Sequence, residues 1–271
     1  MPLKRQSRKV LASLLLTWAC VAGLEEGSEC VHWAQEYFTF PTSSLVRDLV
    51  GDEERAFKMF EEAYLGHAGN SSWRSLDEVQ TDTRVYGEVL HTSVVALLRC
   101  VGASTGQRFY DLGSGTGKIV ALAALYGMNA TGVEVARGRC EAAQEAAERL
   151  TTLAAPLGSF VPPSNLCASF SDVDFSDADI VFANSLLFDE EMVESLARSA
   201  SRMRPGSWII TYRTFLGPSF VTVGKFSGHV SWSDELFEWS LQRVLPPSAS
   251  ASEPWTCKNS FAGNGECSQR G

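Results

Sequence analysis

The segment FYDLGSGTGKIV, residues 109–120, holds the residue types and spacing best suited to ligand binding in this chain. Gly113, Gly115 and Gly117 alternate in it, Asp111 precedes them by two residues, and Lys118 follows them. Glycine-rich turns between a strand and a helix let the backbone approach a nucleotide closely and offer N–H groups to it. The segment therefore predicts a nucleotide-binding turn.

The spacing argues against two common nucleotide classes. A phosphate loop of the ATP and GTP hydrolases needs a glycine five residues before its Gly-Lys pair and Ser or Thr after it. Leu112 and Ile119 occupy those positions here. A dinucleotide turn follows the pattern G-x-G-x-x-G, and Lys118 stands where its third glycine would fall.

Two acids favour a third ligand, S-adenosylmethionine. Asp111 would repel a pyrophosphate, whereas it can bind the ammonium group of S-adenosylmethionine, which carries no phosphate. Glu134 lies 21 residues beyond Gly113, at the end of the next expected strand, where a carboxylate accepts hydrogen bonds from ribose hydroxyls. Because NAD also has such hydroxyls, Glu134 does not choose between the two ligands. NAD, and a turn that binds no ligand, remain the alternatives.

Three further stretches carry a family resemblance: VYGEVL (85–90), DIVFANSLLFDEEMVESLARSASRMRPGSWIITYRTF (179–215) and GHVSW (228–232). In order and spacing they resemble the catalytic domain of the disruptor-of-telomeric-silencing (DOT) family, over about residues 80–240. Members of this family are histone-lysine methyltransferases that modify a lysine in the globular core of histone H3. The resemblance implies a class I, seven-stranded methyltransferase fold, S-adenosylmethionine as cofactor and a protein lysine, such as one of histone H3 in a nucleosome, as substrate.

The resemblance also implies two sets of site residues. For the cofactor these are Tyr86, Gly87 and Glu88 in a closing loop, Asp111, Gly113, Ser114, Gly115 and Gly117 in the turn, Glu134 at the ribose, Ser169 and Phe170 at the adenine, and Asn184 at the sulfonium. For catalysis and a narrow lysine channel they are Asn184, Tyr86, Phe188, Phe215, Trp232 and Trp239.

The chemistry at Asn184 can be stated without the family. Methyl transfer to an amine is an in-line displacement that needs alignment more than a strong base. An apolar aromatic sleeve lowers the pKa of a lysine by desolvation, and aromatic faces attract a methylammonium cation. Each candidate also has a purely structural interpretation. Glu88 would cap the following helix, Asn184 would serve a turn, the aromatic residues would fill the core, and Lys118 would be solvated.

Three departures from the family pattern leave other functions open. Ser169 stands where the better-known members have an adenine-binding aspartate, and Ser185 replaces the second asparagine of their Asn-Asn pair. The basic segment with which those members hold the nucleosome is absent. The net charge is −9, and no run of Lys and Arg follows residue 9, which disfavours direct nucleic-acid binding. The alternatives are a class I methyltransferase of a small molecule or non-histone protein, and a catalytically silent module that binds an adenosyl ligand.

Hydrophobic periodicity predicts helices at 43–66, 88–101, 117–127, 136–154 and 189–203. It predicts strands at 108–112, 130–135, near 166–170, at 178–184 and within 204–215, followed by an antiparallel pair at 220–232 and 236–245. Strands that alternate with helices indicate an open α/β sheet. We therefore expect a class I methyltransferase Rossmann-like fold, mostly parallel, with an antiparallel C-terminal strand pair and a helical N-terminal extension.

The segments outside this sheet differ in composition. Residues 1–23 combine basic MPLKRQSRK with a 14-residue apolar run, VLASLLLTWACVAG, which is the layout of a secretory signal and too short for a comfortable membrane span. An organellar presequence, or a buried helix behind a basic arm, is the alternative, and a nuclear location follows if the family function holds. We assign residues 24–80 to the helical extension, 81–245 to the DOT-type domain and 246–271 to a disordered tail.

The seven cysteines form no C-x-x-C pair, so the spacing of a zinc site is absent and no metal is expected. Cys100, Cys140 and Cys167 fall in apolar segments and are interpreted as small core residues. Cys257 and Cys267 lie in the polar tail, where they could bridge each other in an oxidising compartment.

Overall fold

A computed structural model describes residues 53–65, 88–231 and 233–246, together with the backbone of residues 30–31, 255–257 and 267–269. The helices in this part of the chain are α3 (Glu53–Tyr64), α4 (His91–Cys100), α5 (Lys118–Leu125), α6 (Arg137–Ala154) and α7 (Glu190–Ala200). The strands of the main sheet are β1 (Cys30–Val31), β2 (Arg108–Leu112), β3 (Asn129–Glu134), β4 (Ser164–Cys167), β5 (Ile180–Ala183), β6 (Trp208–Thr211), β7 (Phe220–Val230) and β8 (Ser233–Val244).

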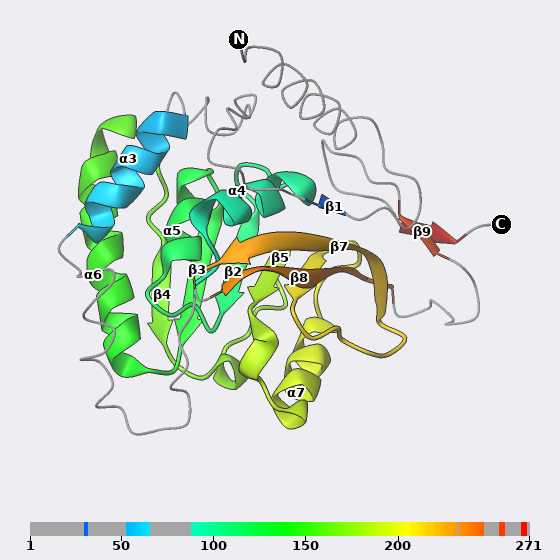
Figure 1. The fold of residues 1–271 in the computed structure, drawn as a ribbon. Helices are drawn as coiled ribbons and strands as arrows, with labels where there is room; N and C mark the ends of the chain where they lie inside the picture. Colours follow the sequence, from blue (N-terminus) through cyan, green and yellow to red (C-terminus); the bar gives the residue numbers. More distant parts are fainter. Residues whose placement is uncertain are drawn as a thin grey trace, which may run out of the picture.

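The strand order in the sheet is β1-β7-β8-β6-β5-β2-β3-β4 (Figure 1). Strands β2 to β6 run parallel to one another, and β8 lies antiparallel between β6 and β7. This arrangement confirms the predicted fold, with the two-residue β1 as an additional edge strand. The strand order reverses at β2, because β3 and β4 follow on one side of β2 whereas β5 and β6 follow on the other. The crevice at the carboxyl end of β2 is where open α/β sheets bind ligands.

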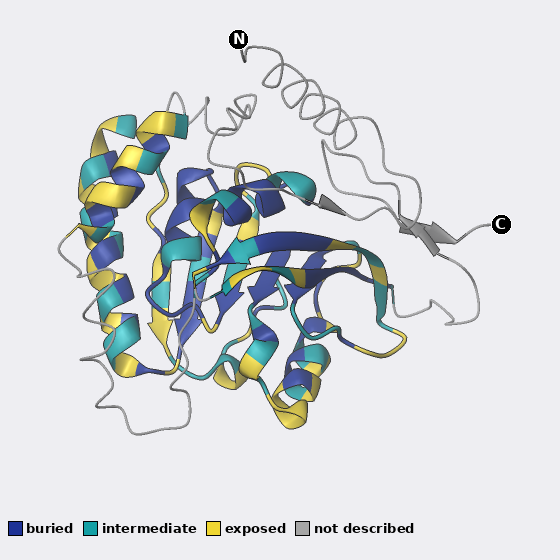
Figure 2. Ribbon diagram, viewed as in Figure 1, coloured by how far each residue is buried: buried dark blue, intermediate teal, exposed yellow. Residues whose placement is uncertain are grey.

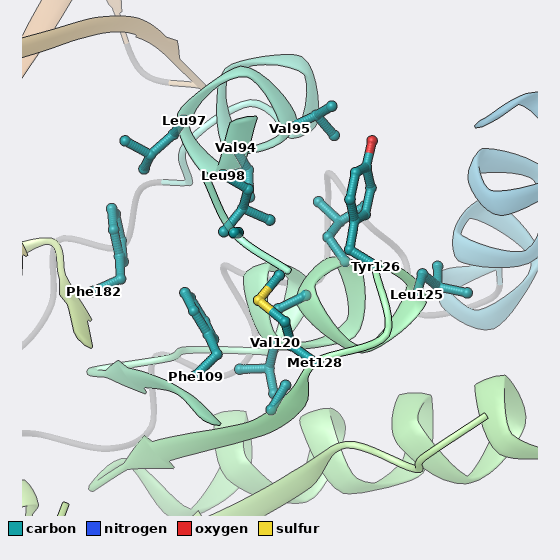
Figure 3. Close-up of a cluster of buried hydrophobic side chains, with 14 of the residues drawn as sticks. Val94, Val95, Leu97, Leu98, Phe109, Val120, Leu125, Tyr126, Met128 and Phe182 are labelled. Carbon is teal, nitrogen blue, oxygen red and sulfur yellow. The ribbon is translucent and has the colours of Figure 1, made fainter. Parts of the chain in front are cut away.

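Alternating side chains divide the core into two layers. In β5, Ile180 and Phe182 pack into the cluster under α4 and α5, whereas Val181 and Ala183 pack into the cluster under α7. Figure 3 shows the first layer, where side chains of α4 meet Phe109 and Phe182. Buried residues fill the central strands, and exposed ones gather on the outer faces of α6 and α7 (Figure 2). The sheet is therefore covered on both faces, as its continuous apolar strands require.

The N-terminal extension contributes α3, which packs along α6 (Figure 1). Its apolar face buries Ala56, Met59, Phe60 and Ala63. The Phe57 ring meets His91 of α4 at 5.1 Å. At its beginning, Glu53 accepts a hydrogen bond of 3.0 Å from the Tyr126 hydroxyl. A helix inside the predicted range 43–66 is thus integrated into the α/β fold.

Several predictions fall on the ends of the chain. The targeting segment 1–23, most of the extension 24–80 and part of the tail 246–271 lie outside the described residues and stay predictions. Within the tail, β9 (Trp255–Cys257) and β10 (Cys267–Gln269) pair antiparallel, with Cys257 directly opposite Cys267. The backbone register therefore brings these two positions together, as a bridge between them would require.

A search of the described residues finds no helix with the length and apolarity needed to cross a membrane. The same residues contain no group of three or more His, Cys, Asp or Glu side chains that could hold a metal ion.

Candidate active site

The glycine turn begins where β2 ends. Gly113, Gly115 and Gly117 have φ values of 88°, 56° and 74°, in the left-handed region that side chains with a Cβ rarely adopt. The N–H groups of Gly113 and Ser114 donate to the Val133 carbonyl of β3 at 2.8 and 3.0 Å. A Cβ on Gly117 would lie 2.9 Å from the side-chain oxygen of Asn165. The left-handed conformation therefore favours glycine at all three positions, and close packing against β4 and α6 adds a second requirement at Gly117.

Two buried acids flank the turn, Asp111 at 2% exposure and Glu134 at 5%. Glu134 Oε2 accepts a hydrogen bond from the Gly115 N–H at 2.8 Å, and Oε1 accepts one from the Ala136 N–H at 2.8 Å and one from Arg139 at 3.1 Å. A carboxylate has about four acceptor positions, so Glu134 retains capacity for a ligand hydroxyl. Burial, followed by the charge of Glu134, raises the pKa of Asp111 to about 8.

The two buried carboxyl groups beside the glycine turn fit S-adenosylmethionine. Asp111 would gain a cationic partner from the ligand's ammonium group, which would offset the cost of burying its charge. Neither acid suits a pyrophosphate, because the charge of Glu134 would repel it and Asp111 would have to keep its proton beside it. The Ser114 hydroxyl is buried without a hydrogen-bond partner, and it lies against Gly132 of β3. The structure therefore places the Ser114 side chain against the sheet, while the Ser114 carbonyl accepts a hydrogen bond of 2.9 Å from the Gly117 N–H within the turn.

Glu88 connects the predicted closing loop to the turn. Its carboxylate accepts a hydrogen bond from Lys118 Nζ at 2.6 Å and one from the Thr116 hydroxyl at 3.4 Å. The helix cap of α4 is Leu90, which makes no side-chain cap, so the interpretation of Glu88 as a helix cap is wrong. The interpretation of Lys118 as solvated is also wrong, because this ion pair leaves its side chain only 24% exposed. Tyr86 and Gly87 lie outside the described residues.

Two aromatic side chains stack beside the turn. The rings of Phe170 and Phe188 lie 5.3 Å apart with an interplanar angle of 25°. A Cβ on Gly113 would be 3.5 Å from the Phe188 ring, so this ring borders the glycine turn. Ser169 caps the 3-10 turn η3 (Phe170–Asp172) by accepting a hydrogen bond from the Ser171 N–H at 3.3 Å. The structure thus groups Phe188 with the predicted adenine aromatic, Phe170.

Asn184 follows β5 at the carboxyl edge of the sheet, and its side-chain oxygen accepts a hydrogen bond of 3.4 Å from the indole N–H of Trp239. Ser185, the substituted second position of the family's Asn-Asn pair, is fully buried. Its hydroxyl accepts a hydrogen bond from the Arg213 N–H at 2.8 Å. This bond ties the end of β5 to the loop after β6. Ser185 therefore has a structural role, and Asn184 still lies at the end of β5, where it contacts Trp239.

The remaining channel candidates occupy different surroundings. Trp239 is fully buried between the rings of Phe182 and Phe226, at centroid distances of 6.4 and 6.2 Å. Phe215 is 2% exposed in the core layer under α7, with the edge of its ring against Phe220. Trp232 lies outside the described residues. Among the predicted channel residues that the structure describes, Trp239 is the one hydrogen-bonded to Asn184.

A hollow of about 430 Å³ opens beside Trp239, between the loop after β6 and the β7–β8 hairpin. Its lining includes Tyr212, Phe237 and Trp239, together with Glu235 and the ion-paired Glu238 and Lys225. The hairpin extends past the end of β6, because Thr211 pairs with Ser240 and the β8 residues of the lining begin earlier in the strand, at Glu235. An aromatic hollow with acidic side chains therefore lies next to the residue that contacts Asn184.

The interpretation of Cys140 as a small core residue is confirmed, whereas that of Cys167 is wrong because this residue is exposed. A disulfide links the two cysteines. It joins the first turn of α6 to the last residue of β4. Cys167 pairs with Glu134 in the sheet register and lies three residues before Phe170. The sequence spacing of 27 residues carried no signal for this bond, because only the sheet order brings α6 and β4 together. Cys100 is a free thiol that packs against the core cluster but is only partly buried, which differs from its interpretation as a core residue.

The family model for the histone methylation protein DOT1 matches residues 74–258, more than half of the chain. The chain belongs to the DOT1 family. This match covers the glycine turn, both acids, Asn184 and Trp239.

Curated relatives of the DOT1 family include proteins named histone-lysine N-methyltransferase, H3 lysine-79 specific. The one from Debaryomyces hansenii is 32% identical over 152 residues, which cover 50% of this chain and 12% of that protein. The one from Eremothecium gossypii is 28% identical over 148 residues, which cover 51% of this chain and 26% of that protein. The chain thus spans about a quarter or less of these two relatives.

Among solved structures, magnesium protoporphyrin IX methyltransferase from Synechocystis PCC 6803 is 16% identical with a TM-score of 0.44, covering 78% of this chain and all of that one. An RNA methyltransferase from Salinibacter ruber is 17% identical with a TM-score of 0.40, covering 60% and 96%. These likenesses are weak, and the family assignment rests on the sequence match.

Proposed function

We propose that this protein transfers a methyl group from S-adenosylmethionine to the side-chain amine of a protein lysine. The observation that carries the proposal is the buried Asp111 before a left-handed glycine turn, with Glu134 bonded to that turn. When bound, S-adenosylmethionine supplies an electrophilic methyl group on a sulfonium. The membership in the DOT1 family supports the same reaction.

The turn and its acids bind and orient the cofactor. Asp111 binds the ammonium group, and Glu134 accepts a hydrogen bond from a ribose hydroxyl while it holds the turn through the Gly115 N–H. The stacked rings of Phe170 and Phe188 provide an apolar shelf for the adenine. Asn184 follows β5, which neighbours β2 in the sheet, so it would lie at the same sheet edge as a cofactor held by the turn.

Asn184 orients the acceptor amine. Its amide oxygen accepts the Trp239 N–H and has a second lone pair for an amine hydrogen. A neutral amide suits this step, because transfer needs an unprotonated and aligned amine rather than a strong base. The aromatic side chains of the hollow beside Trp239 offer their faces to a lysine side chain and to its methylated ammonium group.

We further propose that the lysine lies in a basic protein segment without bound nucleic acid. The named relatives are specific for histone H3. For this chain, the support for that substrate is its membership in the family. The acidic net charge of −9 and the glutamates of the hollow favour a basic peptide and disfavour DNA. Free histone H3 is therefore a better first substrate than the nucleosome.

A methyl-transfer assay with labelled S-adenosylmethionine tests the proposal on free histone H3, on nucleosomes and on lysine peptides. We expect label on lysine in free H3 and less on nucleosomes. The Asn184→Ala variant is the matched control, because it should retain cofactor binding by calorimetry and lose transfer. Binding by the wild type without transfer to any acceptor, itself included, would favour the silent module. Heat with NAD and none with S-adenosylmethionine would refute the cofactor.

A further inference from the structure

The C-terminal end of α3 contacts the glycine turn from outside the matched region 74–258. The Tyr64 hydroxyl donates a hydrogen bond of 3.1 Å to the backbone carbonyl of Thr116. Thr116 is 2% exposed and lies between Gly115 and Gly117, two of the three left-handed glycines that shape the turn. A side chain of the N-terminal extension thus hydrogen-bonds to the backbone of the proposed cofactor-binding turn.

A second set of contacts surrounds the same point. Lys118 Nζ lies 5.7 Å from the centroid of the Tyr64 ring, a distance at which an ammonium is attracted to an aromatic face. The same Nζ donates to Glu88 at 2.6 Å, and the Thr116 hydroxyl donates to the other oxygen of Glu88. Tyr64, Lys118 and Glu88 therefore form one connected cluster around Thr116.

The phenol of Tyr64 remains a donor across the physiological range. Burial raises its pKa most, the charges of Glu88 and Asp111 raise it further, and Arg149 opposes them. Arg149 also donates to the Ala63 carbonyl at 2.6 Å, which fixes the last turn of α3 on α6. The hydroxyl therefore reaches Thr116 from a helix end that is itself held in place.

We propose that Tyr64 is a positioning residue of the cofactor site, which makes α3 part of that site. Its hydrogen bond keeps Thr116 and the neighbouring turn amides in the conformation that binds the ligand. The inference rests on the proposed function for the identity of the ligand, S-adenosylmethionine.

The test compares Tyr64→Phe with Tyr126→Phe. Both substitutions remove one buried phenol hydroxyl that anchors α3, but Tyr126 bonds Glu53 at the far end of the helix. Calorimetry with S-adenosylmethionine should show about threefold to tenfold weaker binding for Y64F, the loss expected for one neutral hydrogen bond. Y126F should bind like the wild type.

Hydrogen exchange without ligand provides a second readout. The amides of residues 113–118 should exchange faster in Y64F than in the wild type, and not in Y126F. Wild-type binding and exchange in Y64F, or equal losses in both variants, would overturn the inference, since Tyr64 would then only dock the helix. If the wild type itself bound no S-adenosylmethionine, the proposed function would fail, and the exchange comparison would still decide whether Tyr64 positions the turn.

Discussion

Replacing Asp111 with Asn should stabilise the unliganded protein at neutral and alkaline pH and weaken its binding of S-adenosylmethionine. The ordinary pKa of this carboxyl is 3.8, and burial raises it to about 8 in the folded protein. Between these values the unfolded chain has lost the proton that the folded protein retains. The stability of the wild type is therefore fully present below pH about 4 and falls as the pH rises through about 8.

The magnitude follows from the size of the shift. A change from 3.8 to about 8 is about four pKa units, which at about 1.4 kcal/mol per unit sets an upper bound of about 6 kcal/mol. Asn has nearly the shape of the protonated acid and does not ionise, so D111N avoids this loss. The excess stability of D111N should be about 1–2 kcal/mol at pH 5 and several kcal/mol at pH 8.

Urea unfolding of both proteins at half-unit steps from pH 5 to 8.5, followed by tryptophan fluorescence, measures this difference. Asp172→Asn, at an exposed position, controls for the change in net charge and should show a flat difference. Calorimetry of D111N should show binding weakened about tenfold or more, because a charge-assisted hydrogen bond is lost. A stability difference between D111N and the wild type that stays constant from pH 5 to 8.5 would refute the reasoning.

Three further variants test the turn, the disulfide and the acceptor side. Gly117→Ala should lose at least 2 kcal/mol of stability in urea unfolding, because strain adds to a clash with its neighbours, whereas Gly158→Ala, with the same left-handed φ and nothing within 4 Å, should lose about 1–2 kcal/mol. Cys140→Ser should lose about 3 kcal/mol, the entropy of a loop closed over 27 residues. Trp239→Phe should lower kcat about twofold to tenfold at unchanged cofactor affinity, because Asn184 loses the donor that orients it.

Each of these expectations has a result that contradicts it. Equal losses in the two glycine variants would show that the space around Gly117 is unimportant. An unfolding midpoint of the wild type that does not move when reductant is added would mean that the disulfide contributes nothing. Weaker cofactor binding by W239F at unchanged kcat would assign Trp239 to the cofactor rather than to the acceptor.

Local patterns in the sequence predict most of the fold and the cofactor half of the site. Glycines at 113, 115 and 117 between an apolar strand and a helix permit few backbone paths, and the structure adopts the expected one. The distance of Glu134 from the turn in the sequence predicts its place beside the turn, because consecutive parallel strands bring their carboxyl ends to one edge of the sheet. The strand predicted near 166–170 spans Ser164–Cys167 instead, and it ends before Ser169 because that residue caps a 3-10 turn.

Contacts between distant parts of the chain were decided only by the tertiary structure. The partners Glu88 and Lys118 are 30 residues apart, and Tyr64 and Thr116 are 52 apart. Their side-chain types allow many pairings, so local spacing does not select one. Cys140 and Cys167 meet only because β4 pairs with β3 beside the start of α6. The local sequence thus determined which segments form turns, strands or helices. The packing of the helices on the ordered sheet determined which side chains meet.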